Sequence, residues 1–118
     1  MFYKVNPDGY KTVLKGVRMK TLVHGERTLF SEFRFEKGAV IPVHSHVHEQ
    51  TGYVVKGAMR FTVAGETVMV KEGDSWNLPS NVPHGAEALE ESVVVEVFSP
   101  VREDYLMGKE HNQNDVAH

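Results

Sequence analysis

Short apolar runs, interrupted at regular intervals by glycine, dominate the pattern of hydrophobic and polar positions along this chain. β-Branched and aromatic residues are concentrated in Tyr53–Val55, Phe61–Val63, Val68–Val70 and Val93–Phe98, and such residues favour strands. Residues 29–35 follow a two-residue period only in part. Because turn signals recur every ~8–12 residues, the pattern predicts an all-β sandwich or barrel.

The turns are marked mainly by glycine-containing pairs. They are His24-Gly25, Lys37-Gly38, Lys56-Gly57, Ala64-Gly65, Glu72-Gly73 and, without glycine, Glu90-Glu91. No long helical pattern is present, and the segment Arg102–Met107 predicts about one and a half turns of helix. After Gly108 the sequence KEHNQNDVAH is mostly polar, which predicts a disordered tail over 109–118. The remaining residues, 1–108, are predicted to form a single domain.

Composition narrows the possible partners and chemistries. The chain has 118 residues, enough for one core. Its net charge is −3 with neutral histidines, and no cluster of Lys and Arg is present, so neither nucleic acid nor an anionic membrane is an expected partner. The absence of cysteine excludes disulfides, thiolate nucleophiles and Cys-rich zinc sites. Residues 1–10 contain no apolar leader segment, and no apolar run approaches membrane-spanning length, so a cytoplasmic protein is expected.

Candidate chemistry is densest in one short segment. His44, His46, His48 and Gln50 lie within seven residues, and His84 follows a proline-containing turn. Two histidines at i and i+2 on an extended strand project from the same face, where they can hold one ion that distant groups complete. Three histidines with one oxygen donor suit a transition metal. The opposing interpretation, histidines that only serve barrel hydrogen bonds, would bury three imidazoles at considerable cost.

The first of two motifs in this chain resembles that of the small single-domain cupins. The cupin motif has glycine, five residues, His-x-His, three or four residues, Glu, six residues and glycine. The chain matches it from Gly38 through His44 and His46 to Gly57, with Gln50 where the family usually has Glu.

A second motif follows at the expected separation. It comprises Gly73, Pro79, His84 and two departures, Asn81 in place of glycine and Ala88 in place of asparagine. Asparagine tolerates the left-handed conformation that a glycine would supply. The resemblance covers roughly residues 28–100. It implies an all-β fold, the double-stranded β-helix or jelly-roll barrel of the cupins.

Within the cupins, the segments HSHVHEQ, GYVVKG, NVPHG and VVVEVFSPVREDYL resemble the small pectin-degradation cupins. Those enzymes convert cyclic unsaturated uronates into open-chain keto-uronates, so the resemblance implies an acidic sugar as the small-molecule substrate. It implies one divalent transition metal (Ni, Zn, Fe, Mn or Co) held by His44, His46, Gln50 and His84. It also implies catalytic roles for Glu96, Phe98 and Arg102. The family position of Glu96 is typically Asp, one methylene shorter.

The charge of the implied ligand set bears on the chemistry. A carboxylate ligand stabilises an oxidised metal, which suits oxygen-activating iron. The neutral amide of Gln50 instead leaves the ion a stronger Lewis acid, suited to polarising oxygens. In uronate ring opening, Glu96 would move the protons. Arg102 would clamp the substrate carboxylate bidentately, and Phe98 would form an apolar wall.

Several alternatives remain open from the sequence. If Val95 and Val97 face the sheet-packing side, Glu96 is a surface acid, whereas a Glu96 inside the barrel is a charge in a confined site. His48 is expected to stack over the metal, to hydrogen-bond to a ligand or to face solvent. Other candidate functions are a metal-dependent dioxygenase, a non-catalytic small-molecule-binding cupin, and a polyketide cyclase or lyase. Because exposed sheet edges need cover, a homodimer is expected, with Tyr10–Val23 as the candidate edge.

Overall fold

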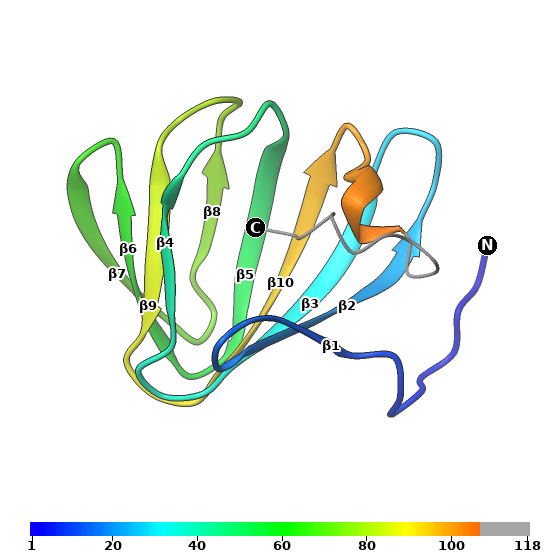
Figure 1. Cartoon of the computed structure of the whole chain (residues 1–118), viewed down its shortest axis with the longest axis horizontal. Helices are drawn as coiled ribbons and strands as arrows, with labels where there is room; N and C mark the ends of the chain where they lie inside the picture. The colour runs from blue at the N-terminus through cyan, green and yellow to red at the C-terminus, as the bar shows by residue number, and fades with distance from the viewer. Residues whose placement is uncertain (107–118) are drawn as a thin grey trace.

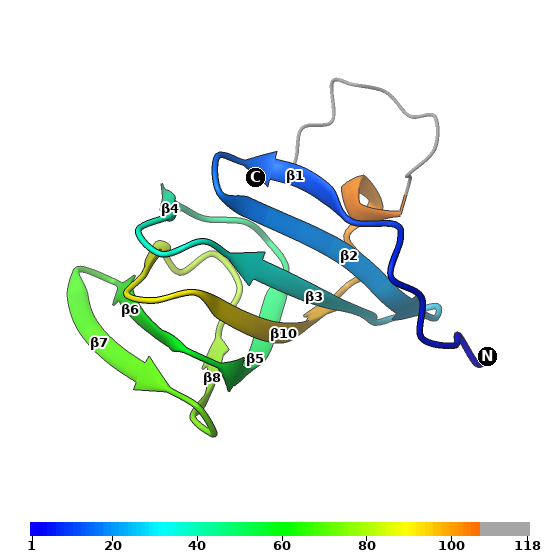
Figure 2. The same cartoon turned by 90° about the horizontal axis from the view of Figure 1, so that it is seen from below.

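The computed structural model describes residues 1–106, in which ten antiparallel strands build two sheets that curve toward each other (Figure 1). The six-stranded sheet has the order β1-β2-β3-β10-β5-β8, and the four-stranded sheet has the order β4-β9-β6-β7. The view from below shows the two sheets as opposite walls of one barrel (Figure 2). The strands are β1 Lys11–Leu14, β2 Val17–His24, β3 Leu29–Phe35, β4 Val40–His44, β5 Glu49–Lys56, β6 Ala58–Val63, β7 Glu66–Lys71, β8 Ser75–Leu78, β9 His84–Ala88 and β10 Ser92–Ser99.

The predicted all-β jelly roll is confirmed. The apolar runs identified in the sequence lie within β5, β6, β7 and β10, and β3 coincides with residues 29–35. The strands β8 and β9, with the sequences SWNL and HGAEA, contain no β-branched residue. They are strands because β5 pairs with β8, while β4 and β6 pair with β9. Tertiary pairing therefore overrides their weak intrinsic preference.

The helix predicted over Arg102–Met107 is shorter in the structure. A single 3-10 turn, η1, spans Glu103–Tyr105. Its bonds run from Tyr105 N to Arg102 O at 2.9 Å and from Leu106 N to Glu103 O at 3.0 Å. The last residue of that prediction and the tail predicted over 109–118 lie outside the described residues. The described residues contain no helix with the length and apolar character needed to cross a membrane.

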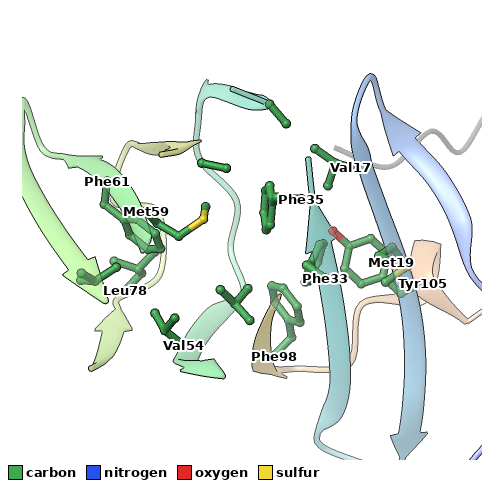
Figure 3. Close-up of a cluster of buried hydrophobic side chains, with 14 of the residues drawn as sticks. Val17, Met19, Phe33, Phe35, Val54, Met59, Phe61, Leu78, Phe98 and Tyr105 are labelled. Atoms are coloured by element: carbon green, nitrogen blue, oxygen red, sulfur yellow. The ribbon is translucent and has the colours of Figure 1, made fainter. Parts of the chain in front are cut away.

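The core lies between the two sheets and consists of the inward-facing positions of their strands (Figure 3). The central strand β10 illustrates the alternation, because Ser92, Val94, Glu96 and Phe98 are buried while the residues between them are half-buried. Phe98 is 1% exposed and Val94 is 2% exposed. Burying one such apolar side chain stabilises the fold by roughly 1.5–3 kcal/mol. The same alternation brings Glu96 into the barrel.

The backbone conformations of two turn residues explain which amino acids occupy these motif positions. Asn81 has φ of 66°, so it adopts the left-handed conformation expected for it. Gly57, with φ of 92°, faces a further constraint. A Cβ there would collide with Ser92 Oγ and Glu91 O. Glycine is therefore required where β5 turns into β6.

Candidate metal centre

The three motif histidines come from two strands and a loop. His44 ends β4 and His84 begins β9, and the two residues are paired in register. The expectation that His44 and His46 share one extended strand is wrong, because β4 ends at His44 and His46 lies in the loop before β5. That loop is fixed by the second motif, since Asn81 N donates a hydrogen bond of 2.7 Å to His46 O.

The rings of these histidines converge. Their candidate ligand atoms all lie within 4.8 Å of one another. The ring centroids of His44 and His84 are 4.5 Å apart, and those of His46 and His84 are 5.0 Å apart. Such proximity is what a single shared ion requires.

Each ring is oriented by a hydrogen bond from its Nδ1 atom to a backbone carbonyl two residues away. The Nδ1 atoms lie 2.9 Å from Pro42 O for His44, 3.0 Å from His48 O for His46 and 2.9 Å from Val82 O for His84. A carbonyl oxygen only accepts, so each Nδ1 carries the hydrogen and each Nε2 keeps a free lone pair. Backbone partners of this kind hold metal-binding histidines in the correct tautomer.

The free lone pairs have no partner within the protein as described. The Nε2 atoms of His46 and His84 are buried and make no hydrogen bond among residues 1–106. Burial, followed by the positive charge of Arg102, lowers the pKa of His46 to about 4, and burial likewise lowers the pKa of His84. The rings of His46 and His84 are therefore neutral at physiological pH. Neutral imidazoles with orphaned, convergent Nε2 atoms fit a divalent transition metal.

Gln50 lies beside this cluster on β5. It is 6% exposed and lines the same cavity as His44 and His84. Its Nε2 donates a hydrogen bond of 2.6 Å to Glu96 Oε2. Because this carboxyl oxygen accepts the bond, the amide must present its nitrogen there, which leaves the amide oxygen of Gln50 as the available donor atom. The amide oxygen of Gln50 is therefore a candidate fourth ligand beside the three imidazoles of His44, His46 and His84.

Glu96 faces the interior of the barrel, so the alternative of a surface acid is contradicted. It is 7% exposed, and its Oε2 also accepts a 3.0 Å hydrogen bond from Trp76 Nε1. Burial raises the pKa of Glu96 to about 7, against the opposing effects of the bonds from Trp76 and Gln50 and of the charge of Arg102. A carboxyl with that pKa can both accept and release a proton near neutral pH.

Arg102 is held among aromatic rings just beyond β10. It is 6% exposed, and its guanidinium carbon lies 5.1 Å from the ring centroid of Phe98 and 4.1 Å from that of Tyr105. Asp104 engages one edge of the guanidinium, with Nη2 to Oδ2 at 2.8 Å and Nε to Oδ1 at 3.3 Å. Within residues 1–106 no hydrogen bond of Nη1 is found, so this side is the candidate for contact with a ligand. Phe98 also meets His46 edge-on, with ring centroids 6.2 Å apart.

His48 lies close to the cluster without joining it. Its ring meets that of His46 with centroids 5.4 Å apart, and its Nδ1 is buried with no partner in the 1–106 range. The alternative in which His48 simply faces solvent is therefore contradicted. The convergent set found in the described chain comprises His44, His46 and His84. The position of His48 supports a contact with His46.

One cavity lies beside these groups, although His46 and His48 are not part of its lining. It contains about 620 Å³ of unfilled space, its open mouth included, and most of its lining is apolar and aromatic side chains. Its polar lining consists of His44, Gln50, His84, Glu96, Arg102 and Tyr105. Sequence reasoning missed Trp76, Asp104 and Tyr105. Trp76 is the single tryptophan of the chain, but nothing in its neighbours marks the bond to Glu96.

Comparison with known proteins places this site in a family. The profile described as "Cupin domain" matches residues 31–99, which include all four candidate ligands and Glu96. This chain belongs to the cupin family. This cupin is 34% identical over 93 residues to the pectin degradation protein KdgF of Dickeya dadantii, covering 77% of this chain and 84% of that protein.

Solved structures agree with the sequence comparison. The structure of KdgF from a Halomonas species superimposes with a TM-score of 0.85 at 35% identity, covering 90% of this chain and 98% of that one. An RmlC-like cupin from Shewanella frigidimarina superimposes with a TM-score of 0.84 at 29% identity, covering 90% and 96%. The chain is therefore homologous to KdgF over nearly its whole fold.

Proposed function

We propose that this cupin is a metal-dependent enzyme that opens and ketonises 4,5-unsaturated uronates, the monosaccharides released in pectin and alginate breakdown. Homology to a protein named for pectin degradation supports the substrate class. The observation that carries the proposal is the buried acid Glu96, which lies in one cavity with Arg102 and with a neutral donor set for a metal. Acid, cation and metal ligands together match the needs of this isomerisation.

In this proposal His44, His46, Gln50 and His84 hold one divalent transition metal, with Ni, Zn, Fe, Mn and Co as candidates. When bound, the ion supplies Lewis-acid polarisation of a substrate oxygen, and the neutral ligands leave its charge undiminished. Arg102 binds the substrate carboxylate through its Nη1 side, because Asp104 engages the other edge. Phe98 closes the cavity beside His46 and excludes water.

The reaction moves one proton from O1 to C4 in two transfer steps and releases no atom. Removal of the proton on O1 forms the C1 carbonyl and breaks the bond from C1 to the ring oxygen. The ring oxygen then belongs to an enolate at C5, which becomes a ketone when a proton is added at C4. Glu96, whose pKa burial raises to about 7, takes the proton from O1 and returns one to C4. One carboxyl can serve both steps, because accepting the proton from O1 leaves Glu96 protonated, and donating a proton to C4 returns it to the carboxylate.

The test is turnover of 4,5-unsaturated galacturonate by the metal-loaded protein, followed by loss of the ultraviolet absorbance of the C4=C5 bond. Turnover should be the same with and without oxygen. A rate that requires oxygen would instead favour a dioxygenase, and saturable binding without product would favour a binding cupin. The corresponding guluronate-derived substrate tests whether alginate products are also accepted.

The proposal includes a cytoplasmic homodimer. Two features support the association of two copies. β1 is an edge strand of the six-stranded sheet, and Met1, Phe2 and Val5 before it expose their apolar side chains. An exposed edge beside an apolar segment favours pairing with a second chain. Light scattering should give twice the monomer mass over a wide concentration range, and a constant monomer mass would contradict the dimer.

A further inference from the structure

Tyr105 lines the cavity of the candidate site, and its backbone and ring are both fixed by contacts with the barrel. The hydroxyl of Thr21 on β2 donates a hydrogen bond of 2.7 Å to Tyr105 O, which anchors η1 to the barrel. The tyrosine ring then packs edge-on against Phe33 at 6.1 Å and against Phe98 at 5.4 Å between centroids. The guanidinium of Arg102 lies 4.1 Å from its centroid. The ring is therefore fixed on several sides, and its hydroxyl has a defined position.

The hydroxyl itself has no partner in the described chain. Tyr105 is 6% exposed and lines the cavity that also contains Gln50 and Glu96. The hydrogen bonds of Tyr105 found within residues 1–106 involve its backbone only. The ring extends from η1 toward Phe33, with the hydroxyl at its leading end (Figure 3). The buried side-chain atoms without a partner in the described residues belong to His46, His48 and His84, so the Tyr105 hydroxyl is accessible from the cavity, where a ligand can reach it.

We propose that the Tyr105 hydroxyl binds an uncharged hydroxyl group of the sugar acid in this cavity, and so acts as a specificity-determining contact. The proposal rests on the uronate-binding function proposed above. The other polar groups of the cavity have different roles to fill. Arg102 suits a carboxylate, Glu96 suits a mobile proton and the imidazoles suit a metal. A neutral O–H group, which donates and accepts, suits a ligand hydroxyl.

The electrostatics of the site keep this group a donor. Burial raises the pKa of Tyr105 above its usual range; the charge of Arg102 opposes this, whereas those of Asp104 and Glu96 add to it. The phenol is therefore protonated throughout the pH range in which the protein would work. A site that hydrogen-bonds a ligand hydroxyl discriminates against ligands that lack it, because its own polar group is then left unpaired.

The first measurement asks whether the hydroxyl has a structural role. Tyr105→Phe keeps the packed ring and should leave the Tm unchanged or slightly higher. Tyr10→Phe removes a hydroxyl that donates a 2.7 Å hydrogen bond to Glu32, so it should lower the Tm. Tyr53→Phe removes an exposed hydroxyl outside the barrel and should be neutral. A fall in Tm for Tyr105→Phe as large as that for Tyr10→Phe would overturn the proposal, because it would reveal a structural partner.

The second measurement compares two ligands by titration of zinc-loaded proteins whose metal content is equal. Galacturonate carries a carboxylate and ring hydroxyls, whereas tetrahydropyran-2-carboxylate carries the ring and carboxylate alone. The Tyr105→Phe variant should bind galacturonate roughly 3- to 10-fold more weakly than wild type does, because one neutral hydrogen bond is lost. Binding of the deoxygenated acid should change less than about twofold, and Tyr53→Phe should change neither.

The outcomes separate this proposal from the proposed function. If wild type binds galacturonate but does not turn over the unsaturated uronate, the proposed reaction fails, while the role of Tyr105 is decided by the affinity ratios. If Tyr105→Phe lowers the affinity for both ligands equally, or for neither, Tyr105 does not bind a ligand hydroxyl and the proposal is overturned. If wild type binds neither acid, the ligand class assigned to the cavity is overturned.

Discussion

Gln50 Nε2 donates a 2.6 Å hydrogen bond to Glu96 Oε2, which joins the neutral member of the candidate metal set to the buried acid of the same cavity. The two residues lie on adjacent strands and diagonally across the ladder, since Gln50 pairs with Phe98 and Glu96 pairs with Gly52. The same Oε2 accepts a bond from Trp76 Nε1. The orientation of Gln50 therefore depends on Glu96, which in turn depends on Trp76.

Gln50→Glu is the sharpest test of the neutral ligand. The variant should keep the fold and bind the metal at least as tightly, because a carboxylate adds a charge-assisted bond. It should lower turnover, since the added charge weakens the Lewis acid and places a second carboxyl beside Glu96. With iron bound, it should oxidise in air faster than wild type. Metal affinity, turnover and air oxidation at one pH check these outcomes.

Gln50→Ala is the matched comparison, and it should weaken metal binding by removing a ligand. Turnover and iron oxidation equal to wild type in Gln50→Glu would mean that the neutral amide has no electronic role. The preference for a non-redox function would then lose its physical basis.

The pH dependence of stability in the metal-free protein should report on Glu96. Its pKa in the folded state is about 7, above the ordinary value of 4.5, so the protonated form favours folding. This stability is complete below pH 4.5 and is lost as the pH rises through 7. The change corresponds to roughly 3 kcal/mol.

The lowered pKa values of His46, His48 and His84 make stability rise over the same pH range. The contribution of Glu96 is therefore measured as the difference between Glu96→Gln and wild type, and the variant should gain stability relative to wild type between pH 4.5 and pH 8. Chemical denaturation at these two pH values measures the difference. Glu66→Gln, at an exposed position, should leave the profile as in wild type, and a Glu96→Gln profile parallel to that of wild type would contradict the assignment to Glu96.

Gly52→Ala should displace the indole of Trp76, which donates a hydrogen bond to Glu96. A Cβ at this position would collide with the indole ring of Trp76, which also packs against Phe61 with ring centroids 4.6 Å apart. Because the packed indole must shift to make room, we expect a loss of about 1–3 kcal/mol of stability. Gly25→Ala is the control, because nothing lies within 4 Å of its added Cβ. Equal stability of the two variants would contradict the packing described here.

Metal capture should be visible in the fluorescence of the single tryptophan. Trp76 contacts Glu96, which contacts Gln50, so ligation of Gln50 changes the surroundings of the indole. Zinc added to chelator-stripped wild type should change the emission until about one equivalent per chain is bound. His46→Ala should lose this response and the bound metal measured by elemental analysis. His24→Ala, at an exposed residue, should keep both; a wild type that cannot be reloaded would end the metal proposal.

Arg102 and Glu96 should affect different kinetic parameters on an unsaturated uronate. Arg102→Ala should mainly raise KM, because a clamp on the carboxylate acts in the ground state and the transition state alike. Glu96→Gln should mainly lower kcat, because a proton carrier acts only in the transition state. Steady-state kinetics separates the two, and negligible effects of both would assign β10 a structural role.

Local features of the sequence were sufficient for much of this protein. The two-residue alternation of β10 predicts that Glu96 shares a face with Val94 and Phe98, and these residues are buried together. The left-handed conformation of Asn81 follows from its own side chain. The resemblance of the two motifs to those of the cupins implied the barrel. The first two properties depend on residues that are neighbours along the chain.

The arrangement of the site was decided only by the tertiary structure. His46 leaves the strand that was expected to hold it, and its position depends on Asn81, from a distant turn. The bonds that Gln50 and Trp76 donate to Glu96 join three strands through their pairing register. No local pattern encodes such a register, because it follows from the packing of the whole barrel. The engagement of Arg102 by Asp104 and the position of the Tyr105 ring likewise depend on how η1 docks against the strands.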